Sequence, residues 1–167
     1  AYEKYEPTRA GRAIQDFVIE NLSNWYVRLS RKRYWGGDYT KDKISAYQTL
    51  YTCLETVALL SAPIAPFYMD RLFADLNQAT GRYQTNVHLA TFPIADPSMI
   101  DKQLEERMEM AQQISSMVLG LRRKVQIRVR QPLGKLLIPI LNGEMTTQLE
   151  AVKNIILSEV NVKEIEY

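Results

Sequence analysis

The chain has 167 residues, of which 46% are hydrophobic and 24% charged, and its formal net charge is +2. These values are typical of a globular protein with its own core and argue against intrinsic disorder. A single cysteine, Cys53, and a single histidine, His88, exclude an internal disulfide framework and a metal site built on several such ligands. No apolar run approaches the roughly 20 residues of a membrane span, and the N-terminus has no signal-peptide pattern, so we expect a cytoplasmic chain without a membrane partner.

The N-terminal part of the sequence predicts one long helix. It should run from about residue 8, after Pro7, to residue 35, because apolar residues recur there at spacings of three and four. This stripe consists of Ile14, Val18, Leu22, Trp25 and Leu29. Gly36 and Gly37 then end the helix, and either Asp38 or Thr40 can cap the next one.

Two further helices are predicted on either side of a proline-rich break. The second continues the same spacing as far as Ser61, and Pro63 and Pro66 in the segment SAPIAPF interrupt it. The third begins at Pro66 and stops at Gly81. Its residues expected to face the core are Phe67, Leu72, Phe73 and Leu76.

The second half of the sequence predicts a connector, a fourth helix and a small α/β region. Residues 82–100 carry no helical stripe and contain two prolines, so they should form an extended connector. Asp101 is a good N-cap for a helix of about 24 residues. Beyond Pro132, LLIPIL predicts a strand, Asn142-Gly143 a turn, residues 145–157 a helix and VNVKEIEY a second strand.

The predicted fold class is therefore mainly α, with an antiparallel helical bundle and a small C-terminal α/β appendage. Three regions are expected along the chain. They are a bundle over residues 1–100 that includes the connector 82–100, a long helix with a basic segment over 101–130, and a β-α-β appendage over 131–167.

A first basic cluster lies in NWYVRLSRKRYW. Arg28, Arg31 and Trp35 follow helical spacing, and Arg33 lies among them. Guanidinium groups pair with phosphates and stack on bases, and an indole offers a platform to an unstacked base, so contact with RNA is one interpretation. The other is a solvated basic face beside core aromatic residues.

A second basic cluster is denser, because residues 120–135 hold six basic residues and no acidic one. These are Arg122, Arg123, Lys124, Arg128, Arg130 and Lys135. Cations complement the dipole at a helix C-terminus, which accounts for the first three but not for Arg128 and Arg130. Gln126, Arg128 and Arg130 should point to one side of an extended segment, which is typical of an edge that tracks phosphates. The alternative is a structural corner in which Arg128 pairs with an acidic residue.

The sequence offers no convincing catalytic site. No glycine-rich phosphate loop follows a strand, and a lone His88 in a connector is more typical of a structural residue than of a general base. Cys53 on the second helix fits an inert buried thiol. We therefore expect neither a catalytic residue nor a metal or cofactor site in these residues.

Four segments together carry a resemblance to a known family. They are EPTRAGRAIQDFVIENLSNWYVRLSRKRYW, the SAPIAPF break, NVHLATFP and IRVRQPL. The chain resembles, along essentially its whole length, the anticodon-binding region of isoleucyl-tRNA synthetase, a class I aminoacyl-tRNA synthetase.

The resemblance implies a bundle of the anticodon-binding type, whose partners are the anticodon arm of tRNA(Ile) and the remainder of the parent synthetase. The full-length enzyme would ligate isoleucine to its tRNA with ATP and Mg²⁺, whereas this fragment, which lacks the HIGH-type and KMSKS-type signatures, is expected to be non-catalytic. The residues implied in RNA binding are Arg28, Arg31, Arg33, Trp35, Arg122, Arg123, Lys124, Arg128 and Arg130.

Relatives are expected to have a further helix before the position of Ala1, so the bundle should be truncated at its N-terminal helix. Such a loss would expose an apolar patch or drive self-association. Two alternatives to the leading interpretation remain. One is a helical protein-interaction or inter-domain docking module without specific RNA binding, and the other is the equivalent module of the valyl or leucyl enzyme.

Overall fold

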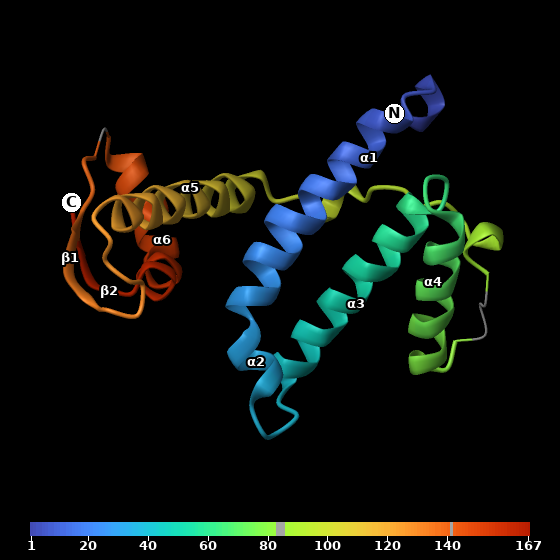
Figure 1. Cartoon of the computed structure of the whole chain (residues 1–167), viewed down its shortest axis with the longest axis horizontal. Helices are drawn as coiled ribbons and strands as arrows, with labels where there is room; N and C mark the ends of the chain where they lie inside the picture. The colour runs from blue at the N-terminus through green and yellow to red at the C-terminus, as the bar shows by residue number, and fades with distance from the viewer. Residues whose placement is uncertain (83–85, 141) are drawn as a thin grey trace. The chain divides into compact units, whose positions relative to one another are not determined.

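The computed structural model describes residues 1–82, 86–140 and 142–167. The chain divides into two compact units, Ala1–Ala95 and Asp96–Tyr167 (Figure 1). The parts of the predicted connector and first strand that fall on residues 83–85 and 141 lie outside the described residues.

The first unit is helical, and α3 is its central element. α3 contacts most of the other elements of this unit. The helical elements are η1 (Tyr2–Lys4), α1 (Pro7–Asp16), η2 (Phe17–Val27), α2 (Arg31–Trp35), α3 (Lys41–Ser61), α4 (Pro66–Thr80) and η3 (Val87–Leu89). A core of Ala58, Ala62, Phe73 and Val87 lies where α3, α4 and η3 meet.

The first predicted helix is helical over its expected length, but it is not one continuous α-helix. Between Phe17 and Val27 it winds as a π-helix, and a turn at Ser30 separates this stretch from α2. The π-helical stretch is rich in β-branched and aromatic residues, whose propensity for the α-helix is lower. Leu22 and Trp25 are buried, as their place in the apolar stripe predicted.

The second and third helices lie where they were predicted, with Thr40 rather than Asp38 as the N-cap of α3. The Oγ1 atom of Thr40 accepts a hydrogen bond from the Lys43 backbone nitrogen at 3.2 Å. Phe73 is buried as expected, but Phe67 is 91% exposed. The prediction for Phe67 was wrong because nine residues at about 100° each place it opposite Leu76 on the helix.

The second unit packs two helices and a two-stranded sheet. Its elements are η4 (Pro97–Met99), α5 (Lys102–Lys124), β1 (Leu133–Leu137), α6 (Gly143–Val160) and β2 (Val162–Glu166). β1 and β2 pair in parallel, with Leu133 opposite Val162 and Leu137 opposite Glu166, and α6 forms the crossover that parallel strands need. Leu149, Val152 and Ile156 on α6 are buried, as predicted, and α6 packs against α5.

The capping residues explain where the two long helices of this unit begin. The side chain of Asp101 accepts a hydrogen bond from the Leu104 nitrogen at 3.0 Å, as predicted. Asn142 was expected in a turn, but it caps α6 by accepting from the Met145 nitrogen at 2.8 Å. The predicted fold class, mainly α with a small α/β part, is confirmed. Among the described residues, no helix has the length and apolar character that crossing a membrane requires.

Candidate nucleic-acid interface

The turn between α2 and α3 presents exposed aromatic side chains beside arginines. Trp35 is 83% exposed and Tyr39 is 77% exposed, and Arg31 is exposed as well. Lys43 holds the turn from inside, because its buried ammonium group donates to the Gly36 carbonyl and lies 4.6 Å from the centre of the Tyr39 ring. We call Arg31, Arg33, Trp35 and Tyr39 the aromatic tip.

Within the aromatic tip, Arg33 is already engaged by α3. Its Nε and Nη2 atoms each lie 2.8 Å from a carboxylate oxygen of Asp42, and Nη2 also donates to the Asp42 carbonyl at 3.2 Å. These hydrogen bonds raise the pKa of Arg33 and hold the pKa of the Asp42 carboxyl below its ordinary value. Arg33 therefore fixes α2 against α3, whereas Arg31 and Trp35 are presented to solvent.

Two tyrosines anchor the same region to α3. The hydroxyl groups of Tyr26 and Tyr34 both donate to the Ala46 carbonyl, at 3.1 and 3.5 Å. Burial, followed by the interaction with Tyr26, raises the pKa of Tyr34 to about 12, so its hydroxyl stays protonated at neutral pH. Arg28 is exposed but precedes the turn at Ser30, so the helical spacing assumed between Arg28 and Arg31 does not describe one unbroken helix.

The second cluster lies at the end of α5 and in the turns that follow it. Arg123, Lys124, Arg128 and Arg130 are exposed, and none of them forms an ion pair with an acidic side chain among the residues the structure describes. We call these four residues the basic turn. The alternative in which Arg128 pairs with an acidic residue thus has no counterpart in the described contacts.

The local backbone of the basic turn differs from the prediction. Residues 125–131 form successive turns, and Gln126 adopts a left-handed conformation with φ of 56°. The expectation that Gln126, Arg128 and Arg130 alternate along an extended segment was therefore wrong. Val125 and Gln126 instead form a turn directly after α5, in which the Ile127 nitrogen donates to the Arg122 carbonyl at 2.9 Å.

Arg122 requires a correction as well. It was expected among the RNA-binding residues, but it is only 3% exposed. Its guanidinium group donates to main-chain carbonyls of the basic-turn segment and of the end of α6. A side chain in this position has no access to a phosphate, so Arg122 does not belong to an exposed interface.

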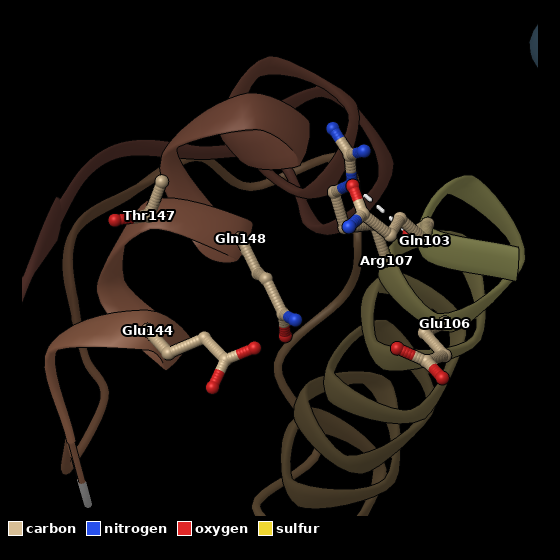
Figure 2. A pocket seen from close by; sticks show the side chains of 6 residues that line it. All are labelled: Gln103, Glu106, Arg107, Glu144, Thr147 and Gln148. Carbon is tan, nitrogen blue, oxygen red and sulfur yellow. Dashed lines mark hydrogen bonds between the residues drawn. The ribbon is translucent and has the colours of Figure 1, made fainter.

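The structure also shows a shallow hollow between the first turns of α5 and α6 (Figure 2). Its lining is polar and of mixed charge and comprises Gln103, Glu106, Arg107, Glu144, Thr147 and Gln148. The Nε atom of Arg107 donates to the Gln103 carbonyl at 3.0 Å. None of the residues expected to bind RNA lines this hollow.

Cys53 carries the single thiol of the chain. Burial raises the pKa of the Cys53 thiol, which disfavours the reactive thiolate. Within the described ranges, no three residues of histidine, cysteine, aspartate or glutamate gather as metal ligands would.

The sequence analysis did not single out three residues that shape the two clusters, namely Tyr39, Lys43 and Asn161. An aromatic residue directly after Gly36-Gly37-Asp38 is the one signal that could have indicated Tyr39.

Comparisons with known proteins show to which family the chain belongs. A family model described as the anticodon-binding domain of tRNA ligase matches residues 1–137. An isoleucine–tRNA ligase of Bacteroides thetaiotaomicron is 63% identical over 99% of this chain, and one of Cytophaga hutchinsonii is 60% identical over all of it. A third, from Thermoplasma volcanium, is 41% identical over 99% of the chain.

The chain spans only a small part of these relatives, 14% of the length of the first and 15% of the other two. The family model, in contrast, covers most of the chain, including α1 to α5 and β1. It contains both the aromatic tip and the basic turn. The chain therefore belongs to the family of anticodon-binding domains of tRNA ligases.

Proposed function

We propose that this chain binds the anticodon arm of tRNA(Ile) and does so as part of an isoleucine–tRNA ligase in the cytoplasm. The observation that carries the proposal is the basic turn, in which four exposed cations lie together without a described acidic partner. Phosphate groups are the natural counter-charges for such a surface. The names of the relatives support isoleucine as the amino acid.

In this proposal the two clusters have different tasks. Arg123, Lys124, Arg128 and Arg130 contact phosphates, which positions the RNA without reading its sequence. Trp35 and Tyr39 offer exposed rings on which splayed anticodon bases stack, and Arg31 and Arg28 are exposed cations of the same unit. Arg33 serves as a positioning residue, because Asp42 already occupies its guanidinium group.

The ligation of isoleucine, with its ATP and Mg²⁺, is proposed for the whole ligase. No step of that reaction is assigned to the residues of this chain. Exposed apolar side chains, among them Phe67, Tyr68 and Ile94, support a contact with the remainder of a parent synthetase. Sedimentation of the isolated chain tests this contact, since concentration-dependent dimers would favour self-association instead.

The experiment that tests the proposed function is a titration of the chain with tRNA(Ile) and with a non-cognate tRNA at low and moderate salt. We expect a preference for tRNA(Ile) that survives moderate salt, because base contacts depend on salt much less than phosphate contacts do. Equal binding of the two tRNAs that vanishes with salt would reduce the function to electrostatic attraction. The absence of binding at low salt would favour a module that contacts protein only.

A further inference from the structure

The buried guanidinium group of Arg122 contacts two segments that are distant in sequence. Its Nη1 atom donates to the carbonyls of Arg128 and Gln131, both at 3.1 Å. Its Nη2 atom donates to the carbonyls of Gln131 at 3.0 Å, Val160 at 2.9 Å and Asn161 at 3.1 Å. One side chain thus ties the segment after α5 to the end of α6.

Asn161 completes this arrangement from the other side. It adopts a left-handed conformation, with φ of 51° and ψ of 57°, at the end of α6. Its Nδ2 atom donates to the Val129 carbonyl at 2.8 Å, and its own carbonyl accepts from the Leu133 nitrogen at 3.1 Å. The carbonyls of residues 128, 129 and 131 are therefore all held by Arg122 or Asn161.

The charge of Arg122 is suited to this site although no carboxylate meets it in the described contacts. The carbonyls of Val160 and Asn161 are among those that the last turn of α6 leaves without helical partners, and they form the negative end of its dipole. A planar guanidinium group can reach several carbonyls at once with fixed geometry, whereas a lysine ammonium group is a compact point charge. The site therefore requires arginine and not only a positive charge.

Arg122 and Asn161 bind the backbone carbonyls of this segment, whereas the side chains of Arg128 and Arg130 remain exposed. We propose that Arg122 and Asn161 are positioning residues that fix the turns over 125–131, so that Arg128 and Arg130 meet tRNA phosphates in a defined arrangement. This inference rests on the proposed function. Arg122 then has an indirect task in RNA binding, although its burial excludes a direct contact with phosphate.

The test compares Arg122→Lys, which keeps the charge, with Arg128→Gln/Arg130→Gln and with all three changes combined. Affinity for tRNA(Ile) is measured over a series of salt concentrations. In the parent chain, Arg128→Gln/Arg130→Gln should weaken binding about tenfold and lower the salt slope by about 1 for each residue. Arg122→Lys should produce most of that loss, and adding the other two changes to it should cost less than about twofold more.

Two further variants serve as controls, one for the loss of a distant positive charge and one for the contact made by Asn161. Lys102→Gln removes a cation about 30 Å away along α5 and should leave the affinity nearly unchanged. Asn161→Gly removes only the amide that holds Val129, since glycine tolerates the left-handed backbone, and it should lower the salt slope in the same direction as Arg122→Lys. Circular dichroism confirms that each variant is folded at the assay temperature, and Asn161→Gly decides the matter if Arg122→Lys does not fold.

Each outcome separates this inference from the proposed function. Additive losses for Arg122→Lys and Arg128→Gln/Arg130→Gln, or an unchanged salt slope in folded Arg122→Lys or Asn161→Gly, would overturn the positioning task and leave tRNA binding intact. A parent chain that does not bind tRNA(Ile) would refute the proposed function itself. If a parent chain that binds tRNA(Ile) is unaffected by Arg128→Gln/Arg130→Gln, these two arginines do not belong to the interface and this inference is wrong.

Discussion

The aromatic tip and the basic turn look alike in sequence, but the chain builds them in opposite ways. The aromatic tip is held by side chains of α3, and its central arginine is paired with a carboxylate of Asp42. The basic turn is held through its own backbone carbonyls, and its exposed cations have no described acidic partner. In the aromatic tip, Arg33 stabilises the structure and the aromatic rings are exposed. In the basic turn, Arg122 is buried and the other arginines are exposed.

The number of basic residues in a segment therefore does not measure its capacity to bind nucleic acid. Arg33, Arg122 and Arg128 belong to similar basic segments. Arg33 forms an ion pair with Asp42, Arg122 is buried and donates to backbone carbonyls, and Arg128 is exposed. The comparison predicts that the aromatic tip supplies discrimination between RNAs and the basic turn supplies salt-dependent affinity.

The largest expected effect is on the stability of the second unit, which carries the basic turn but not the aromatic tip. Leu149 is fully buried in α6, and Leu149→Ala should destabilise the second unit by about 2–5 kcal/mol. Both tryptophans, Trp25 and Trp35, lie in the first unit, so tryptophan fluorescence reports that unit alone while circular dichroism reports both. We expect the circular dichroism transition to move to lower denaturant and the fluorescence transition to stay.

The reciprocal control is Phe73→Ala in the core of the first unit, which should shift the fluorescence transition by about 3–5 kcal/mol. If Leu149→Ala shifts both signals equally, the two units unfold as one and the regions cannot be treated separately.

A medium effect is expected at the aromatic tip. Trp35→Ala should weaken binding of tRNA(Ile) by about 1–3 kcal/mol, because it removes the platform on which a base would stack. The salt slope should stay constant, since no phosphate contact is lost. Trp35→Phe retains an aromatic face and should recover much of the affinity. A changed salt slope in Trp35→Ala, or no loss of affinity, would contradict the division of tasks.

The smallest effect concerns the ion pair inside the aromatic tip. Because Arg33 lowers the pKa of Asp42 below 3.8, the pair stabilises the folded chain above that pH, and its contribution disappears as the pH falls through the lowered pKa. Asp42→Asn should therefore lower the melting temperature slightly at neutral pH and not at strongly acidic pH. A difference from the parent chain that persists at low pH would assign the effect to something other than the carboxylate.

The same variant bears on RNA binding. Asp42→Asn removes the negative charge that neutralises Arg33, so Arg33 should attract phosphate and steepen the salt slope by up to about 1 while the preference for tRNA(Ile) decreases. An unchanged slope would mean that Arg33 cannot reach the RNA even when it is released.

The sequence predicted the helices well because periodicity and capping are local properties. Asp101 and Pro66 mark the beginnings of α5 and α4, and Leu22, Phe73 and Leu149 are buried as their spacing indicated. The fate of individual arginines was beyond such reasoning. The burial of Arg122 depends on carbonyls 38 and 39 residues away, and such contacts leave no trace in local spacing.

The direction of the aromatic tip depends on the length of the π-helical stretch η2 that precedes it. In an α-helix each residue turns the chain by about 100°, whereas the wider winding between Phe17 and Val27 turns it less per residue. Inserting or deleting a single residue there would rotate everything that follows around the helix axis. A homologous chain with an identical tip sequence but a different length of this stretch would consequently present Trp35 in another direction.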